Sequence, residues 1–532
     1  MKNEILEAEN LSVTFRNGNE TVNAVGQVSF TLRKGKTLGI VGESGSGKSV
    51  TALAVMNLLP PNALLTGNLF LTNHDGARTG LTALSRRQWQ QIRGNRISMI
   101  FQEPMTSLNP VMRCGKQVTE AILAHQPVTR KQAREKTLDL FREVLLADPE
   151  GAFTAYPHEL SGGQRQRIMI AMALSSGPDI LIADEPTTAL DVTVQQSVIL
   201  LLKSLQQKYN LAILFITHDL NLVKSIAGEL LVMHKGRVVE TGSVEEIFGR
   251  PKHPYTVELL NSGTLQKEAP VQVRETRVPV LQARGVTAVF RGKRKRKDVK
   301  AVDNVSLEVY AGEALGLVGE SGCGKTTLGR TLLKLTEPDR GTILFGDQEL
   351  NKLRKGTLKR FRKEVQIIFQ DPYSSLNPKM TVGAALTEPM TVHGIGKTQR
   401  ERREKAVNLL QKAGLDESFL SRYPHELSGG QRQRVCIARA LSVEPRLIVC
   451  DESVSALDVT IRAQVLKLLK SLKEELGLTL IFISHDLSVV RYISDRIAVM
   501  KDGRIIELNH SEEIWRNPRS QFTKDLISAI PK

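Results

Sequence analysis

Two glycine-rich segments match the pattern of a phosphate-binding loop, in which a glycine and four further residues precede Gly-Lys-Ser or Gly-Lys-Thr. They are GESGSGKS at residues 42–49 and GESGCGKT at residues 319–326. In such a loop the backbone N–H groups surround phosphate oxygens, the lysine reaches the β and γ phosphates, and the hydroxyl contacts Mg²⁺. The chain is therefore predicted to bind two nucleotides.

The two loops belong to a tandem repeat that spans the chain. Lys325 lies 277 positions after Lys48, and Gln370 lies 268 positions after Gln102. A nearly constant offset indicates duplication of one unit, and 532 residues give room for two domains of roughly 250 residues each. We predict a first domain at 1–262, a linker at 263–278 and a second domain at 279–532.

Strands and helices are predicted to alternate within each repeat. The first loop follows the apolar segment KTLGIVG and precedes the helical pattern SVTALAVMNLL, and the second lies between EALGLVG and TTLGRTLLKL. This is the strand-turn-helix context that a phosphate-binding loop requires. The later runs DILIAD, LAILFIT, RLIVCD and LTLIFIS have the composition of buried parallel strands. The predicted fold class is therefore α/β.

Neither a membrane span nor a secretion signal is predicted. No apolar run approaches the roughly 18 residues of a span, and MKNEILEAEN lacks the apolar core of a signal peptide. Cys114, Cys323, Cys436 and Cys450 lack ligand spacing, which fits a reducing compartment and predicts no metal site. Cys323, inside the second loop, is either a tolerated small residue or a thiol-sensitive one. We expect a cytosolic chain unless a partner brings it to a membrane.

The net charge of +17 is compatible with nucleic acid or anionic lipid as a partner. The densest basic run, RGKRKRKDVK at 291–300, lies between two strand-like segments and is interpreted first as a solvated hairpin loop. Contact with lipid headgroups is the alternative. No motif for sequence-specific DNA reading accompanies the charge, so nucleic acid is not expected as a partner.

Further motifs recur in the same order after each loop. Gln102 and Gln370 end apolar runs inside MIFQEPMTSLNP and IIFQDPYSSLNP. The string YPHELSGGQRQR follows at 156–167 and again at 423–434. Its Ser-Gly-Gly segment can bring backbone donors close to an anion at the start of a helix.

Acidic residues and a histidine complete each repeat. Asp184 and Glu185 end one buried run, and their counterparts Asp451 and Glu452 end another. A carboxylate at such a strand end suits Mg²⁺, and its neighbour can orient or deprotonate a water molecule. His218 and His485 follow the next buried strand, where each could sense the γ-phosphate. A purely structural histidine is the alternative.

With these motifs, the whole chain resembles the ATPase subunit of an ABC transporter in which two nucleotide-binding domains are fused. The resemblance implies two tandem P-loop NTPase domains, each with a RecA-like core, an antiparallel β subdomain and a helical subdomain. It implies ATP and Mg²⁺ as cofactors. It also implies that the domains pair head to tail, so that 42–49 faces 428–431 and 319–326 faces 161–164. Both sites are expected to hydrolyse ATP, although Ser453 replaces the usual proline after Glu452.

The resemblance carries roles to individual residues. Nucleotide binding falls to the two loops and to two aromatic residues expected on the adenine: Gly42, Glu43, Ser44, Gly45, Ser46, Gly47, Lys48, Ser49, Gly319, Glu320, Ser321, Gly322, Cys323, Gly324, Lys325, Thr326, Phe15 and Phe290. The signature residues are Ser161, Gly162, Gly163, Gln164, Ser428, Gly429, Gly430 and Gln431. The Mg²⁺ and water ligands are Ser49, Gln102, Asp184, Thr326, Gln370 and Asp451. The catalytic bases are Glu185 and Glu452, and the switch histidines are His218 and His485. For Phe15 and Phe290 a core role remains open.

Within that family, FQEPMTSLNP, FQDPYSSLNP and PKHPYTVELL resemble importers of dipeptides, oligopeptides and nickel, including those for glutathione and peptide antibiotics. The expected partners are two integral-membrane permeases and an extracytoplasmic solute-binding protein, at the cytoplasmic face of the inner membrane. No cysteine cluster follows HPYT, so no iron–sulfur cluster is expected.

Two other classes stay open. A fused ABC ATPase that acts on ribosomes or damaged DNA would suit the basic charge, but the long charged helical linker and the zinc cysteines of those proteins are absent. A fused sugar-importer ATPase is the nearer alternative. The transported solute, and whether the two sites fire together or in turn, are left open.

Overall fold

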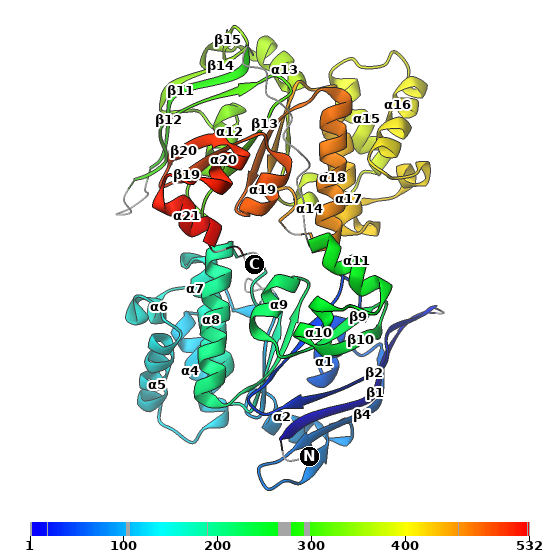
Figure 1. Ribbon diagram of the computed structural model, residues 1–532, viewed down its shortest axis with the longest axis vertical. Helices are drawn as coiled ribbons and strands as arrows, with labels where there is room; N and C mark the ends of the chain where they lie inside the picture. Colours follow the sequence, from blue (N-terminus) through cyan, green and yellow to red (C-terminus); the bar gives the residue numbers. More distant parts are fainter. Residues whose placement is uncertain are drawn as a thin grey trace. The chain divides into compact units, whose positions relative to one another are not determined.

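The computed structural model describes residues 3–18, 20–102, 107–188, 190–263, 278–291, 298–455, 457–528 and 530. The chain divides into two compact units, the first made of most residues before 264 and the second of most residues after 277. Residues 264–277 make up most of the predicted linker and lie outside the described residues, so the boundaries at 262 and 279 stay predictions. Figure 1 shows the helices and strands of both units.

Among the described residues, the first unit contains two sheets. The antiparallel sheet has the strand order β2-β1-β4-β5, and the larger sheet has the order β10-β9-β3-β8-β7-β6. In the larger sheet every pairing is parallel except β9 with β10. The strands are β1 (Glu4–Asn17), β2 (Glu20–Arg33), β3 (Thr37–Val41), β4 (Ala63–Thr72), β5 (Arg78–Gly80), β6 (Ile97–Ile100), β7 (Ile180–Asp184), β8 (Ala212–Thr217), β9 (Glu229–His234) and β10 (Arg237–Ser243).

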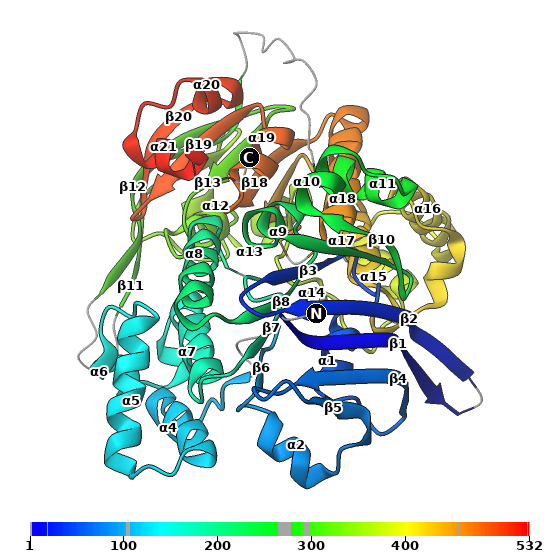
Figure 2. The ribbon, with the colours of Figure 1, turned by 60° about the horizontal axis from the view of Figure 1, so that its bottom comes forward.

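Helices cover this larger sheet and form a separate layer beside it. They are α1 (Lys48–Val55), α2 (Arg86–Ile92), α4 (Cys114–His125), α5 (Arg130–Glu143), α6 (Pro149–Thr154), α7 (Gly162–Leu174), α8 (Val192–Tyr209), α9 (Leu220–Ile226), α10 (Val244–Gly249) and α11 (Pro254–Gly263). Figures 1 and 2 both show α4 to α7 gathered on the side of the unit away from β1, β2 and β4. The chain enters this helical layer after β6 and leaves it at β7.

The second unit repeats the arrangement, with sheets ordered β12-β11-β14-β15 and β16-β17-β18-β13-β19-β20 in its described part. Its strands are β11 (Pro279–Phe290), β12 (Val299–Tyr310), β13 (Ala314–Val318), β14 (Arg340–Phe345), β15 (Gln348–Glu349), β16 (Val365–Ile368), β17 (Leu447–Asp451), β18 (Thr479–Ser484), β19 (Arg496–Lys501) and β20 (Arg504–His510). Its helices are α12 (Lys325–Leu332), α13 (Lys355–Glu364), α14 (Pro372–Ser375), α15 (Val382–Val392), α16 (Gln399–Lys412), α17 (Gly429–Leu441), α18 (Val459–Leu476), α19 (Leu487–Ile493), α20 (Ser511–Arg516) and α21 (Gln521–Ser528).

The central strands are buried on both faces, which explains their unbroken apolar runs. Along β7, Ile180 and Ile182 pack with the antiparallel sheet and α1, whereas Leu181 and Ala183 pack with the helical layer. This alternation is the two-residue period of a strand. A parallel sheet with a different hydrophobic cluster on each face therefore forms the core of each unit and supports the ends of the strands.

The predicted α/β fold with a RecA-like core, an antiparallel β subdomain and a helical subdomain is thus confirmed for both units.

Strands β11 and β12 flank the basic run and pair as an antiparallel hairpin, with Phe290 opposite Val299. Residues 292–297 of that run lie outside the described residues. Among the helices that the structure describes, none combines the length and apolar composition of a membrane span.

Candidate functional site

The first phosphate-binding loop joins the end of β3 to the start of α1. Gly42 and Gly47 have φ angles of 153° and 97°. A Cβ atom at Gly42 would lie 2.2 Å from the carbonyl oxygen of Met233, and one at Gly47 would lie 2.6 Å from that of Ala24. These positions accept only glycine because the loop passes directly against neighbouring backbone. The loop leads directly into the N-terminus of α1, the kind of helix end that binds anions.

The loop lysines are buried and held by backbone carbonyls. Lys48 is 5% exposed, and its ammonium group donates to the carbonyl oxygens of Gly42 and Glu43, both at 2.8 Å. Lys325 makes the same bonds to Gly319 and Glu320, at 2.8 and 2.7 Å. Each positive charge therefore lies inside its loop, where phosphates would be bound.

The second loop differs from the first at one position that contacts the lysine. Cys323 replaces Ser46, and its Sγ lies 3.8 Å from the Lys325 ammonium group. Burial raises the pKa of the Cys323 thiol, and the nearby lysine opposes that rise. The thiol is therefore mostly protonated at neutral pH, which lowers its reactivity.

A hydroxyl and a carboxylate meet beside each loop. Ser49 donates to Asp184 Oδ1 at 3.0 Å, and Thr326 donates to Asp451 Oδ1 at 2.9 Å. Burial raises the pKa of Asp184 to about 6, although the bond from Ser49 opposes the rise, and burial raises the pKa of Asp451 as well. A buried carboxylate that is costly to ionise gains from a cation. Hard oxygen donors of this kind fit Mg²⁺.

Glu185 lies directly after β7 and collects three side-chain contacts. Gln102 and Thr188 donate to its Oε2, each at 2.9 Å, and His218 Nδ1 lies 3.0 Å from its Oε1. Burial would raise the pKa of this carboxyl, but the hydrogen bonds from His218 and Thr188 and the charge of Lys48 lower it to about 2. The group is therefore ionised at neutral pH and able to accept a proton.

Glu452 occupies the equivalent position in the second unit with looser contacts. Gln370 donates to its Oε2 at 2.8 Å, whereas His485 Nδ1 lies 3.8 Å from the same oxygen. Ser455, the counterpart of Thr188, donates to the backbone carbonyl of Glu452 at 2.9 Å. Both glutamates have positive φ, 47° for Glu185 and 46° for Glu452. Such backbone is uncommon for non-glycine residues and occurs here at the same position of both units.

The difference between Thr188 and Ser455 predicts unequal effects of removing their hydroxyls. Thr188→Ala should lower single-turnover ATP hydrolysis at the first site about tenfold, because the Glu185 carboxylate loses a group that orients it. Hydrolysis is measured in a chain that also carries Glu452→Gln. The matched control is Ser455→Ala with Glu185→Gln, which should change turnover less than about twofold, since Ser455 bonds backbone rather than carboxylate. Equal losses in the two chains would contradict this interpretation.

The signature residues begin helices α7 and α17. Ser161 Oγ accepts from Gln164 N at 3.3 Å, while Gln164 Oε1 accepts from Ser161 N at 2.9 Å. Ser428 and Gln431 form the same capping box at 3.3 and 2.9 Å. The box fixes the first turn of each helix, so that its remaining N–H groups form an anion-binding end.

The two aromatic residues expected on adenine differ in their surroundings. Phe15 packs against the hydrophobic cluster of the antiparallel sheet, whereas Phe290 is 55% exposed at the end of β11.

Two contacts near the candidate site were not predicted from the sequence: that of Thr188 with Glu185 and that of Tyr255 with the first loop. The motif PTTALD contains Thr188 and PKHPYTVELL contains Tyr255, but neither motif indicates its contact.

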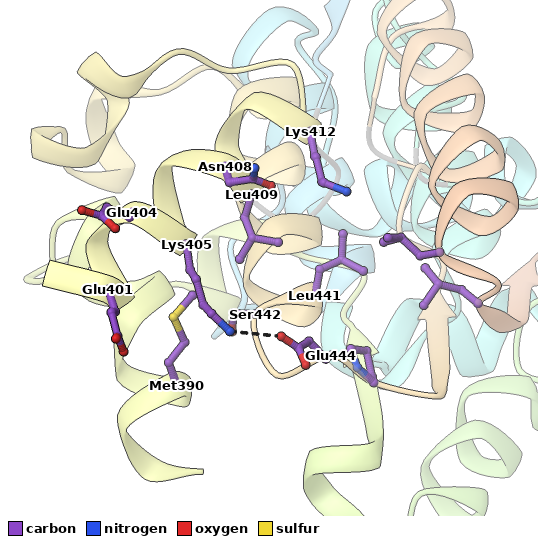
Figure 3. A pocket seen from close by; sticks show the side chains of 13 residues that line it. Met390, Glu401, Glu404, Lys405, Asn408, Leu409, Lys412, Leu441, Ser442 and Glu444 are labelled. Atoms are coloured by element: carbon purple, nitrogen blue, oxygen red, sulfur yellow. Dashed lines mark hydrogen bonds and ion pairs between the residues drawn. The ribbon is translucent and has the colours of Figure 1, made fainter. Parts of the chain in front are cut away.

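A separate pocket of about 680 Å³ lies in the second unit between α16 and the end of α17 (Figure 3). Met390, Leu409 and Leu441 form its apolar wall, and the ion pair of Lys405 with Glu444, at 3.3 Å, crosses its edge. None of its lining residues belongs to a phosphate-binding loop, a signature or the acidic strand ends. It is therefore not part of the candidate nucleotide site.

A phosphate-binding loop at the end of a central parallel strand, with an Asp-Glu pair at the end of a nearby strand, defines a P-loop nucleoside triphosphatase. The family model for ABC transporters matches residues 25–188 and 302–455, and that for the C-terminal region of oligopeptide/dipeptide transporters matches residues 239–283. The chain belongs to the ABC transporter family, as an ATP-hydrolysing subunit with two nucleotide-binding domains.

Curated relatives match almost the whole chain. The glutathione import ATP-binding protein GsiA of Salmonella typhimurium is 44% identical over 559 residues, which cover 99% of this chain and 90% of the relative. GsiA of Pectobacterium atrosepticum is 43% identical over 558 residues, and GsiA of Escherichia coli O157:H7 is 44% identical over 558; both alignments cover 99% of this chain and 89% of the relative. The predicted membership of the dipeptide and oligopeptide branch is confirmed.

Proposed function

We propose that this chain powers the uptake of peptide-like solutes, with glutathione as the first candidate, by hydrolysing ATP at two sites. One observation carries the proposal: both units hold a complete set of loop, Asp-Glu pair, glutamine and histidine, in a chain whose residues 239–283 match oligopeptide transporters. The GsiA proteins that match it over almost its full length are named as glutathione import proteins.

In the proposed cycle each residue acts on a defined part of the nucleotide. Lys48 and Lys325 bind the phosphates through charge. Glu185 and Glu452 accept the proton of the attacking water, and each is presented by a glutamine that donates to it, Gln102 at 2.9 Å and Gln370 at 2.8 Å. His218 and His485 lie beside those carboxylates, at 3.0 and 3.8 Å, where they can respond to the γ-phosphate.

Mg²⁺ fits the hydroxyl–carboxylate pairs, Ser49 with Asp184 and Thr326 with Asp451, and its charge would offset that of the phosphates when it is bound. The loop of each unit would face the signature helix of the other, so that ATP closes the pair and hydrolysis reopens it. Phe15 and Phe290 would stack on the adenines.

The partners of such a subunit would be two integral-membrane permeases, with an extracytoplasmic protein that delivers the solute. The chain would therefore be held at the cytoplasmic face of the inner membrane by protein contacts. No nucleic acid and no iron–sulfur cluster have a place in this cycle.

The test of the partners is co-purification. The tagged full-length chain is extracted from membranes in mild detergent and washed at high salt, because a chain of net charge +17 retains acidic material. We expect two polytopic membrane proteins in constant ratio to the chain. An unrelated tagged protein of similar basic charge is the control. Ribosomal or DNA-repair proteins in place of membrane proteins would contradict the proposal and leave only the ATPase.

A further inference from the structure

The segment that matches the oligopeptide transporter region reaches back to the first phosphate-binding loop. Tyr255, on helix α11, is 7% exposed. Its hydroxyl oxygen accepts a hydrogen bond from the backbone N–H of Glu43 at 3.0 Å, although the two residues are 212 positions apart. Glu43 is the second residue of the loop. The hydroxyl of one tyrosine therefore connects the end of the first unit to the backbone of its nucleotide site.

Two separate contacts fix the position of this hydroxyl. The Tyr255 ring stacks on the His234 ring at the end of β9, with centroids 3.9 Å apart and planes 14° apart. The start of α11 is held to β10, because the Glu240 carboxylate accepts from the backbone N–H groups of Lys252 at 2.8 Å and His253 at 3.0 Å. The ring is thus anchored to the sheet by contacts that do not involve its hydrogen bond with the loop.

Both backbone polar groups of Glu43 are hydrogen-bonded. Its N–H donates to Tyr255, and its carbonyl oxygen accepts from the Lys48 ammonium group at 2.8 Å. The turn at the start of the loop therefore has its backbone fixed in one conformation. A loop that is already ordered loses less conformational entropy when a ligand binds, and its affinity is correspondingly higher.

The second unit has equivalent contacts around the ring and at the start of the helix, but the residue that corresponds to Tyr255 has no hydroxyl. Phe522, on α21, corresponds to Tyr255, and the Lys501 ammonium group lies 4.8 Å from its ring centroid, where His234 stacks in the first unit. The Glu507 carboxylate accepts from the N–H groups of Arg519 at 2.9 Å and Ser520 at 3.1 Å, as Glu240 does. The chain thus contains both the tyrosine and the phenylalanine version of one arrangement.

We propose that Tyr255 is a positioning residue for the first nucleotide site, whose hydroxyl holds the phosphate-binding loop in its binding conformation and makes the two sites unequal in affinity. This inference rests on the proposed nucleotide-binding role of residues 42–49. It gives the C-terminal segment of the first unit a function in ATP binding.

The experiment uses the full-length chain with Lys325→Ala, so that nucleotide binding reports on the first site. Titration with a fluorescent ATP analogue should show that Tyr255→Phe raises Kd about two- to tenfold, the range for loss of one hydrogen bond. The control is Tyr209→Phe, which removes a hydroxyl that bonds Glu143 at 2.6 Å elsewhere in the same unit, and it should leave Kd unchanged. Thermal unfolding of both variants should match that of the parent chain.

The reverse variant gives a second, independent result. In a chain with Lys48→Ala, Phe522→Tyr should tighten binding at the second site, because its hydroxyl can accept from the equivalent loop N–H. Binding that survives Lys48→Ala together with Lys325→Ala would overturn the assignment of the nucleotide sites themselves. If those lysines abolish binding but Tyr255→Phe leaves Kd unchanged, only the role of Tyr255 is overturned. A weaker Kd with a lowered unfolding temperature and no gain from Phe522→Tyr would also overturn it.

Discussion

Replacing Glu185 and Glu452 together with glutamine is expected to lower ATP turnover by about 10²- to 10⁴-fold, the usual contribution of a general base. Glutamine keeps the shape of the side chain and its contact with Gln102 or Gln370 but does not accept a proton. Nucleotide affinity should therefore persist, since the loops and their lysines are unchanged. Phosphate release and equilibrium binding of ATP are measured on the same preparations.

The matched control for this pair is Glu150→Gln with Glu404→Gln, two exposed glutamates of the helical layers. We expect it to leave turnover unchanged. The single variants, Glu185→Gln and Glu452→Gln, show how much of the ATP turnover each site contributes. Residual turnover of about half in each would indicate that the sites hydrolyse ATP independently. Near-complete loss in each would indicate that each site depends on the other. Unchanged turnover in the double variant would remove both glutamates from catalysis.

Replacing the buried phenylalanine of the larger sheet of either unit with alanine should lower the free energy of unfolding by about 3–5 kcal/mol. Phe215 in β8 and Phe482 in β18 are both 0% exposed and face the helical layers of their units. Phe215→Ala and Phe482→Ala each leave a cavity between sheet and helices that close packing cannot refill. The free energy of unfolding is measured by urea denaturation.

Leu200→Ala is the control for these two variants, because Leu200 is 65% exposed on α8, beside the same layer. It should change the free energy of unfolding by no more than about 0.5 kcal/mol. If either phenylalanine variant loses less than about 1 kcal/mol of unfolding free energy, the close packing of the phenylalanine between sheet and helices is contradicted.

The two candidate nucleotide sites share their lysine, glutamine, aspartate, glutamate and histidine, but the contacts of these residues differ. Glu185 has Thr188 and a histidine at 3.0 Å, whereas the histidine of Glu452 is at 3.8 Å. The first loop is also fixed by Tyr255. These differences predict that the sites differ in both affinity and rate.

The parallel strands were predictable because a strand that is buried on both faces has an unbroken run of apolar residues. The run DILIAD at 179–184 and the strand Ile180–Asp184 differ by one residue, and the run LAILFIT differs as little from Ala212–Thr217. The antiparallel sheet and the helical layer were predicted only from the resemblance, because their half-exposed strands and helices lack unbroken apolar runs. Their bounds depend on contacts between distant parts of the chain.

The site was predictable in its residues but not in its contacts. The resemblance assigns Ser49 and Asp184 to one Mg²⁺ ion, and the structure shows the two side chains hydrogen-bonded to each other at 3.0 Å. No local pattern indicates that Tyr255 bonds Glu43, because that contact arises only when α11 returns to the sheet. Similarly, PTTALD and SVSALD read alike, yet Thr188 bonds a carboxylate and Ser455 a backbone carbonyl.

The most direct test of the account is solute uptake by living cells. A strain that lacks this chain is assayed for uptake of labelled glutathione, a dipeptide and an oligopeptide, then complemented with the wild-type chain or with Glu185→Gln/Glu452→Gln. We predict that uptake of at least one of these solutes is lost, restored by the wild-type chain and not restored by the variant. Uptake of all three at the parental rate without the chain would contradict the proposed function.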